Sequence, residues 1–367
     1  MKILTFTKYS YEGPSSRYRF YNYQESFSKN DIEMIIKPLF DKNYFTAKHK
    51  WQKICVAFVA YVKRLLVVVQ VLLSPKKYDL VLLEYELFPY FPSWFEYLFP
   101  KRGVKYIVDY DDAIFHKYDR HPNIVVEKIL GNKIAKVMTY AKSVVVCNAY
   151  LEAYASKYNE HIVTIPTVVL LEKYIEKMKS YQKKEDGSFI IGWIGSWTTG
   201  VYILDIVPAM KQFVQKYENV RFHLVGFDEK LLSKQEKEEA HIDVIAWSEE
   251  QEIEHILDFD IGMMPLPDDA WSRGKCGFKL VQYMSCKKPV IASAVGVNCT
   301  LVEENVNGLL VESNEGWLEA FEKLYVDDVL REKMAQNNFK KIENHFSNIL
   351  IYKQYLEVIV CMLDPKN

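Results

Sequence analysis

Short apolar runs bounded by turn residues alternate with longer helical stretches along the whole chain. This alternation predicts an α/β fold, because parallel strands need a crossover connection, usually an α-helix, between them. The predicted strands are residues 2–7, 31–36, 80–84, 104–109, 143–147, 162–165, 189–194, 220–225, 242–245, 261–265, 289–293 and 308–311. Ligands of parallel sheets bind beyond the carboxyl ends of the strands, so the residues after each strand are the candidates for function.

An uneven composition divides the 367 residues into two dissimilar halves. Residues 1–183 hold 28 Lys and Arg against 18 Asp and Glu, a net charge of +10, whereas the remainder carries −11. Of the 14 glycines, 11 lie at or after Gly187. At about 150 residues per domain, this length fits two domains. We expect them to join near residue 185, in the polar stretch 183–187, which suits an exposed linker.

The overall composition is that of a globular protein, with 49% hydrophobic and 26% charged residues. It excludes wholesale disorder, a coiled coil and collagen. The six cysteines form no CxxC pair, which argues against a zinc site and against a disulfide framework. The N-terminal MKILTFTKYS lacks the apolar core of a signal peptide, so we expect a cytoplasmic protein.

Residues 51–74 form an apolar stretch, WQKICVAFVAYVKRLLVVVQVLLS, that is long enough to resemble a membrane span. The charged pair Lys63 and Arg64 near its centre would be costly in lipid, which argues against a true span. Two interpretations remain open. One is a long helix packed on the sheet; the other is a helix on the membrane surface, where the lysines of residues 48–77 attract anionic headgroups.

A glycine-rich turn follows the strand at residues 189–194. Gly195 allows a ligand to approach the backbone, and Ser196 or Thr198 can cap the next helix so that its first N–H groups face an anion. The alternative is a tight turn with a helix cap and no ligand. Gly226 repeats this arrangement after the next strand, and Trp247 could stack on a base or belong to the core.

A loop of mixed charge follows the strand at residues 261–265. It leads into a helix expected to begin near Gly277. Cations beside a helix N-terminus suit a diphosphate group. Lys279 and Gln282 lie three residues apart and so share one face of that helix. The candidate donor-binding residues of this stretch are Arg273, Lys275, Gly277, Phe278 and Gln282, and the candidate catalytic residues are Asp268, Asp269 and Lys279.

Successive motifs of the second half carry a family resemblance: GWIGSWTT, HLVGFD, DIGMMPLPDD and GKCGFKLVQYMSCKKPVIAS. On these motifs, and more weakly on GPSSRYR and VDYDDAIF in the first half, the chain resembles retaining glycosyltransferases of the GT-B fold, family 4 (group 1). The resemblance implies two Rossmann-like parallel-sheet domains that face a cleft. It implies an acceptor domain at residues 1–185, a nucleotide-sugar donor domain at 186–345, and a last helix, 346–367, that crosses back to the first domain.

The sequence departs from the family's pair of glutamates eight positions apart. Gln282 stands at the second position and Gly274 at the first, so the resemblance leaves Asp268 or Asp269 to hold sugar hydroxyls and Gln282 to hold ribose. The Arg and Lys that many relatives place after the first donor-domain strand are absent. Arg273, Lys275 and Lys279 are the expected substitutes that neutralise the diphosphate.

In the first half, the resemblance places Asp111 at about the position of a family histidine and makes it a catalytic candidate. A DxD metal site formed with Asp109 is the weaker alternative. Arginine side chains offer forked donors to a phosphorylated acceptor or to the donor, or they lie on the surface of a helix. The acceptor-side candidates are Gly13, Ser15, Arg17, Arg19, Glu86, Asp109 and Asp112, with Glu84 ranked lower.

The expected activity is transfer of a sugar from a nucleotide diphosphate sugar to a glycan or lipid-linked acceptor, catalysed by Asp111, Asp268, Asp269 and Lys279. No cofactor, no obligatory metal and no nucleic acid partner are expected. Two alternatives stay open: a sugar-nucleotide epimerase of the same fold, and a non-catalytic partner subunit that has lost the glutamate pair.

Overall fold

The computed structural model describes residues 1–47, 49–183 and 186–363, and it divides into two compact units. The first unit contains Met1–Thr167, Gly274–Cys276 and the chain from Ile349 onward, and the second contains Val168–Arg273 and Gly277–Asn348. The chain therefore leaves the first unit after Thr167, earlier than the expected join near residue 185. Residues 184 and 185 of the expected linker lie outside the described residues, as does Lys48.

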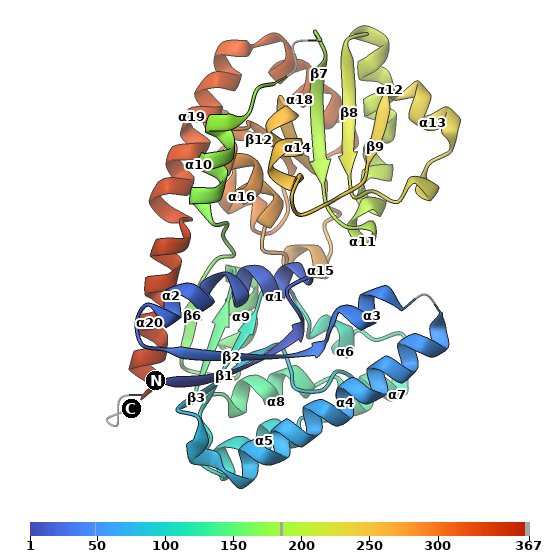
Figure 1. Ribbon diagram of the computed structural model, residues 1–367. Helices are drawn as coiled ribbons and strands as arrows, with labels where there is room; N and C mark the ends of the chain where they lie inside the picture. The colour runs from blue at the N-terminus through green and yellow to red at the C-terminus, as the bar shows by residue number, and fades with distance from the viewer. Residues whose placement is uncertain (48, 184–185, 364–367) are drawn as a thin grey trace. The chain divides into compact units, whose positions relative to one another are not determined.

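The first unit is built on a parallel sheet with the strand order β2-β1-β3-β4-β5-β6 (Figure 1). Its strands are β1 (Lys2–Tyr9), β2 (Glu33–Phe40), β3 (Leu80–Glu84), β4 (Tyr106–Tyr110), β5 (Ser143–Val146) and β6 (Ile162–Thr164). Its helices are α1 (Pro14–Arg19), η1 (Tyr21–Tyr23), α2 (Gln24–Ser28), α3 (Lys42–Thr46), α4 (Lys50–Leu73), η2 (Pro75–Lys77), α5 (Trp94–Lys101), α6 (His116–Asp119), α7 (Ile124–Leu130), α8 (Lys133–Tyr140), α9 (Ala149–Ala155) and α20 (Asn348–Leu363).

The second unit repeats this plan with the strand order β12-β11-β10-β7-β8-β9. Its strands are β7 (Phe189–Ile194), β8 (Val220–Val225), β9 (Ile242–Ile245), β10 (Ile261–Met264), β11 (Val290–Ser293) and β12 (Gly308–Val311). Its helices are α10 (Leu171–Ser180), α11 (Trp197–Gly200), η3 (Val201–Ile206), α12 (Val207–Lys216), η4 (Glu229–Leu231), α13 (Lys234–Glu239), α14 (Glu252–Asp258), α15 (Ala270–Arg273), α16 (Phe278–Ser285), α17 (Asn298–Leu301), α18 (Asn314–Val326) and α19 (Asp328–His345).

All twelve predicted strands are confirmed, and both sheets are parallel. The largest difference in bounds is β2, which begins two residues later than predicted and continues to Phe40. It pairs with β1 as far as Tyr9 and contains Pro38. Proline is tolerated there because β2 is an edge strand, so no neighbour on its outer side needs the missing N–H group.

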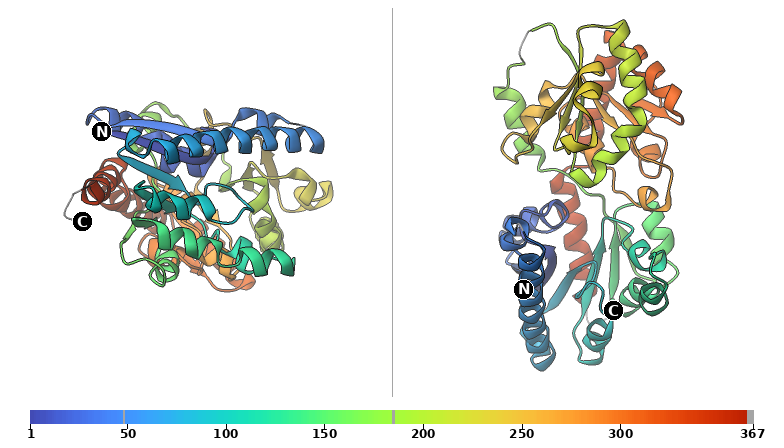
Figure 2. Two further views of the ribbon diagram at one scale, coloured as in Figure 1. Left: turned by 90° about the horizontal axis from the view of Figure 1, so that it is seen from below. Right: turned by 90° about the vertical axis from the view of Figure 1, so that its right-hand side faces the viewer.

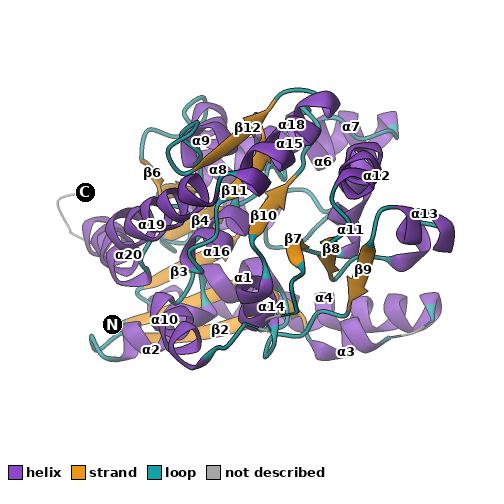
Figure 3. Ribbon diagram, turned by 90° about the horizontal axis from the view of Figure 1, so that it is seen from above, coloured by secondary structure: helices purple, strands orange, loops and turns teal. Residues whose placement is uncertain are grey.

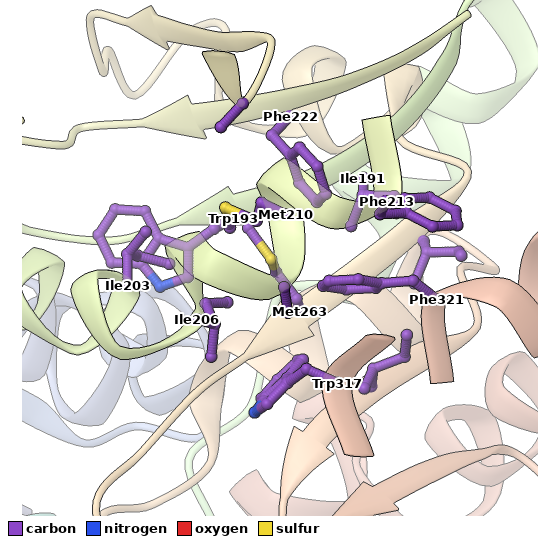
Figure 4. Packing of buried hydrophobic residues seen from close by; sticks show 14 of the residues in the cluster. Ile191, Trp193, Ile203, Ile206, Met210, Phe213, Phe222, Met263, Trp317 and Phe321 are labelled. Carbon is purple, nitrogen blue, oxygen red and sulfur yellow. The ribbon is translucent and has the colours of Figure 1, made fainter. Parts of the chain in front are cut away.

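Two apolar layers cover the two faces of the second sheet. Figure 3 shows the helices that lie on either side of its strands. Side chains of α12 and α18 pack on one face, and those of α10, α14 and α16 pack on the other. Figure 4 shows the first layer, in which the rings of Phe213 of α12, Phe222 of β8 and Trp317 of α18 all lie against Phe321 of α18. This packing fixes the strand ends on which the candidate ligands stand.

Helix α20 belongs to the first unit from Ile349 onward. A buried network attaches it there. The Arg19 guanidinium donates two hydrogen bonds to the Asp109 carboxylate, at 2.9 and 2.7 Å, and the Tyr355 hydroxyl of α20 donates a third. Arg19 also donates to the Ile165 carbonyl, at 2.7 Å.

Arg19 and Asp109 are thus committed to each other and to α20. Both side chains are buried, so the structure does not support the expectation that they contact the acceptor as open ligands. A charge buried without its partner is costly, which explains why a buried arginine is paired here with a carboxylate.

Candidate functional site

The end of β7 and the end of β8 in the second unit touch through their backbones. Gly195 donates a hydrogen bond to the Val225 carbonyl at 3.0 Å, and a Cβ atom on Gly226 would lie 2.3 Å from the Gly195 carbonyl oxygen. Gly226 also has a φ of +76°, which disfavours other residues. These two glycines are therefore required by a close approach of two loops.

The helical run after β7 is less regular than its sequence predicts. Ser196 precedes α11, which has four residues and continues into the 3₁₀ helix η3 before α12 begins. The Ser196 and Thr198 hydroxyls lie 2.7 Å apart. The expected N-terminal anion site thus has only one short helical turn behind it, which limits the aligned backbone dipole there. Two adjacent exposed hydroxyls remain available to a ligand.

Lys279 is the cation that the structure places beside this turn. Gly277 begins α16 with a φ of +68°, and Phe278 and Lys279 form the first turn of the helix. The Lys279 ammonium lies 5.6 Å from the ring centre of Trp193, and a Cβ atom on Gly195 would lie 2.8 Å from Lys279 Cε. Gly195, which follows β7, and Lys279 of α16 therefore lie side by side.

The two candidate carboxylates of the mixed-charge loop are engaged within the loop itself. Asp268 pairs with Arg273 through two hydrogen bonds of 2.6 and 2.9 Å, and these bonds lower the pKa of the Asp268 carboxyl. Asp269 accepts a hydrogen bond from the Ser272 amide at 2.6 Å, at the start of α15. Asp268 and Arg273 are exposed, so a ligand can compete for this pair at little cost.

A cavity of about 410 Å³ opens beyond the carboxyl ends of β10, β11 and β12. Its size suits a small-molecule ligand. It is lined by Pro265, Leu266, Pro267 and Asp268 after β10, by Ser293, Ala294 and Val295 at β11, by Val311, Glu312, Ser313, Asn314 and Trp317 at β12, and by Tyr202, Asp205 and Ile206 of η3. Glu312, Ser313 and Asp205 were not among the predicted residues, although the rule of strand exits would have found the first two.

Gln282 lies deeper than its predicted contact with ribose implies. Its amide donates to Glu252 at 2.9 Å, and the other oxygen of Glu252 accepts a hydrogen bond from the Trp247 indole at 2.9 Å. Glu252 and Gln282 are buried, whereas Trp247 is partly exposed beside Gly226. The structure thus gives Gln282 a positioning role, in which it holds Glu252 and, through it, the exposed Trp247 ring.

The first unit gathers charged side chains at the carboxyl ends of β1, β3 and β4. Glu84 accepts hydrogen bonds from the Ser16 hydroxyl at 2.6 Å and the Lys8 amide at 2.7 Å. Burial raises the pKa of Glu84 to about 7. Burial also lowers the pKa of Lys117 in α6 to about 8, and the positive charge of Lys8 adds to this lowering. Groups with pKa values shifted toward neutrality cluster at functional sites.

Asp111 and Asp112 stand in the same group of charges. The Tyr85 hydroxyl donates to Asp111, and Tyr85 has a φ of +61°, a strained conformation for a non-glycine residue. Burial raises the pKa of Asp112 to about 6, although the Lys275 ammonium lies 3.9 Å away. Strain and perturbed acids together mark this edge of the sheet as the candidate site of the first unit.

Lys275 therefore lies with the carboxylates of the first unit, whereas the sequence led us to expect it at the donor diphosphate. Asn148 donates to the Gly274 and Lys275 carbonyls, at 3.1 and 2.9 Å. A Cβ atom on Gly274 would lie 2.4 Å from the Ala113 Cβ. The glycine at the family's glutamate position is explained by this close approach.

The remaining acceptor-side candidates make contacts within the first unit. Glu86 is buried with Lys133 and accepts from the Tyr118 hydroxyl at 2.8 Å. Gly13 precedes α1 where a Cβ atom would meet Tyr9, and the Arg17 guanidinium lies 5.0 Å from the Tyr18 ring centre. Ser15 is half-buried in α1, and its neighbour Ser16 is the serine that contacts Glu84. Among the described residues, no group of three or more His, Cys, Asp or Glu is placed to hold a metal.

Glu84 makes the stability of the chain depend on pH. In the unfolded chain a glutamate ionises near pH 4.3, but the folded chain keeps the Glu84 proton up to about pH 7. The folded state therefore binds the extra proton in this window, and its free energy of unfolding falls as the pH rises from about 4 to 7. We expect the free energy of unfolding of the wild type, measured with urea, to be lower at pH 8 than at pH 5 by an amount on the order of 1–3 kcal/mol. Glu84→Gln should remove this difference. The same pH dependence in both proteins would contradict this assignment.

Two parallel-sheet units of this topology, each with polar residues beyond its strand ends, have the architecture of the GT-B glycosyltransferases. Residues 175–341 match the family described as glycosyl transferases group 1. The chain is 24% identical over 183 residues to the capsular polysaccharide biosynthesis glycosyltransferase CapM of Staphylococcus aureus. That match covers 48% of this chain and 47% of CapM, so it spans about half the length of this curated relative.

Solved structures show the same fold over almost the whole chain. A glycosyltransferase from Rickettsia africae superposes with a TM-score of 0.65 at 17% identity and covers 99% of both chains. Anabaena Alr3699/HepE in complex with UDP-glucose superposes with a TM-score of 0.69 at 13% identity, covering 98% of this chain and 100% of that one. At these identities the likeness establishes the GT-B fold.

Proposed function

We propose that the chain is a glycosyltransferase that moves a sugar from a nucleotide diphosphate sugar to a glycan or lipid-linked acceptor, in the synthesis of a cell-surface polysaccharide or a similar glycoconjugate. The observation that carries the proposal is Lys279 beside Gly195, a cation at the end of β7 within the residues that match the group 1 family. The UDP-glucose bound to HepE and the capsular role in the name of CapM support this choice of donor and product.

In the proposed reaction, the bond between the sugar's anomeric carbon and the diphosphate oxygen breaks and a bond to the acceptor oxygen forms. The transition state resembles an oxocarbenium ion, and negative charge develops on the departing diphosphate. Lys279 and the backbone around Gly195 and Ser196 stabilise that charge. The acceptor's proton passes to a phosphate oxygen of the leaving diphosphate, the configuration is retained, and no obligatory metal is required.

The test is incubation of the full chain with a panel of nucleotide sugars, with and without saccharide acceptors. We expect transfer, or slow hydrolysis of one donor when no acceptor is present. Isomerisation of the sugar would instead identify an epimerase. Binding of a nucleotide without turnover would identify a non-catalytic partner subunit, and either of these results would overturn the proposal.

In this proposal, Asp111 acts on the acceptor and does not bind the donor. We expect Asp111→Asn to lower the rate of transfer by about 10-fold or more, because the amide does not carry the carboxylate's charge toward the acceptor hydroxyl. The affinity for the nucleotide sugar, measured by calorimetry, should remain within about twofold of wild type. A collapse of donor affinity would move Asp111 into the donor site.

The location that we propose is the cytoplasm, with peripheral contact to the inner face of the cell membrane through residues 48–77. The +10 charge of the first half favours an anionic acceptor or membrane surface over a neutral one.

A further inference from the structure

Helix α4 exposes an apolar stripe along its whole length. The stripe follows the helical period, with intervals of one, three or four residues, and consists of Trp51, Ile54, Phe58, Val59, Val62, Leu65, Leu66, Val69 and Leu73. Trp51 is 78% exposed and Phe58 is 70% exposed. Both views of Figure 2 show α4 at an outer edge of the first unit. An exposed apolar surface of this extent marks a site of contact with another protein or with a membrane.

The opposite side of α4 is fixed to the first unit by Arg64. Its buried guanidinium donates to the carbonyls of Thr7 at 2.6 Å and Lys37 at 3.0 Å, and burial lowers its pKa to about 9. By length and composition α4 could cross a membrane. A crossing would withdraw Arg64 from these carbonyls and place it in lipid, so the structure favours a helix that lies flat on a surface.

The apolar stripe continues onto neighbouring elements. The Tyr61 hydroxyl of α4 donates to the Pro89 carbonyl at 2.8 Å, which joins α4 to the segment 88–97. That segment exposes Phe91 and Trp94, whose rings are in edge-to-face contact. Trp94 also borders a hollow of about 360 Å³ whose other side includes Ile129 of α7. Ile124, Val125 and Ile129 are all exposed on α7.

The charges around this surface have one sign along α4. No Asp or Glu occurs between Asp41 and Asp79, whereas Lys50, Lys53, Lys63, Lys76 and Lys77 lie in or beside the helix. A symmetric contact between two copies would bring the same lysines together and so would be repulsive. Exposed Trp and Tyr side chains beside lysines are the composition that occurs at the boundary between lipid and water.

We propose that α4, segment 88–97 and α7 form one composite face, called here the lipid face, that seats the first unit on a bilayer containing anionic lipids. The apolar side chains enter the boundary of the acyl chains, and the lysines contact phosphate headgroups. This inference does not depend on sugar transfer. It enlarges the contact beyond residues 48–77, because Trp94 and Ile129 belong to the same face.

The test is flotation of the full chain with phosphatidylcholine vesicles that contain either no or 30% phosphatidylglycerol, at about 0.1 M salt. We expect partition into the anionic vesicles, reduced about tenfold or more by Phe58→Asp with Leu66→Asp and severalfold by Trp94→Asp. The matched control is Val326→Asp with Val329→Asp, which changes two equally exposed apolar residues of the second unit and should leave partition unchanged. Circular dichroism and urea unfolding of each variant show that the first unit remains folded.

Quenching of tryptophan fluorescence by brominated lipids tests the composite nature of the face. We expect quenching in the wild type that is reduced by Trp51→Phe and also by Trp94→Phe. No partition of the wild type, or equal partition of the Phe58/Leu66 variant, would overturn the proposal. If the Phe58/Leu66 variant reduced partition but Trp94→Asp left partition unchanged and Trp94→Phe left quenching unchanged, the lipid face would not extend beyond α4 and the composite face would be wrong. A dimer that this α4 variant abolishes, in the absence of vesicle binding, would assign the surface to a second copy.

Discussion

Replacement of Lys279 by alanine is expected to lower the turnover of sugar transfer by about 10²-fold or more, the effect of removing one preorganised donor from a developing anion. Lys279 lies in the first turn of α16 with its side chain against Gly195 and Trp193. Its charge therefore stands where we place the departing diphosphate. Turnover is measured at saturating donor and acceptor, so that weaker binding does not account for the loss.

Two variants control for this effect. Lys340→Ala removes an exposed lysine of α19 in the same unit and should leave turnover unchanged. Lys279→Arg keeps the charge and should recover part of the activity. Unfolding of the Lys279→Ala protein should occur at nearly the wild-type urea concentration because the side chain is only half-buried. Near-normal turnover of Lys279→Ala would contradict the role.

The largest expected loss of stability follows from Arg19→Ala, at about 3–5 kcal/mol. This change leaves the Asp109 carboxylate buried with Tyr355 but without its countercharge. Burial already raises the pKa of Asp109 even with Arg19 present, so the carboxyl would take up a proton in the variant. The free energy of unfolding, measured with urea at pH 7, should therefore fall steeply and recover partly at low pH.

Arg221→Ala is the matched control because it also breaks a bidentate Arg–Asp pair. Arg221 bonds to Asp243 at 2.6 and 2.7 Å, but both side chains are exposed. An exposed pair contributes about 0–1 kcal/mol, so this variant should be close to wild type. Equal losses in Arg19→Ala and Arg221→Ala would show that the buried network does not hold the first unit together.

The strands were predictable because burial on both faces of a parallel sheet requires continuous apolar runs. The ends of β3, β7 and β8 agree with the sequence, and so does the position of Gly195 beyond β7. The proximity of Gly195 and Lys279 was predictable too, since strand exits and helix starts meet at one edge of such a sheet.

The partners of charged side chains were not predictable. Arg19 and Asp109 are 90 residues apart, and nothing in their local sequence shows that each is buried against the other. Lys63 and Arg64 are neighbours in a helix, yet Lys63 is exposed and Arg64 is buried. The tertiary environment, which the pattern of hydrophobic residues does not contain, determines which of two adjacent cations is desolvated.

The return of α20 to the first unit has a consequence for biosynthesis. Tyr355 follows its partner Asp109 by 246 residues, and at about 5–20 residues per second a ribosome needs roughly 12–50 s to make that interval. During this time the Arg19–Asp109 pair lacks its third member, while the strands of the second unit have already been translated. The half of the protein that is made first is therefore completed last.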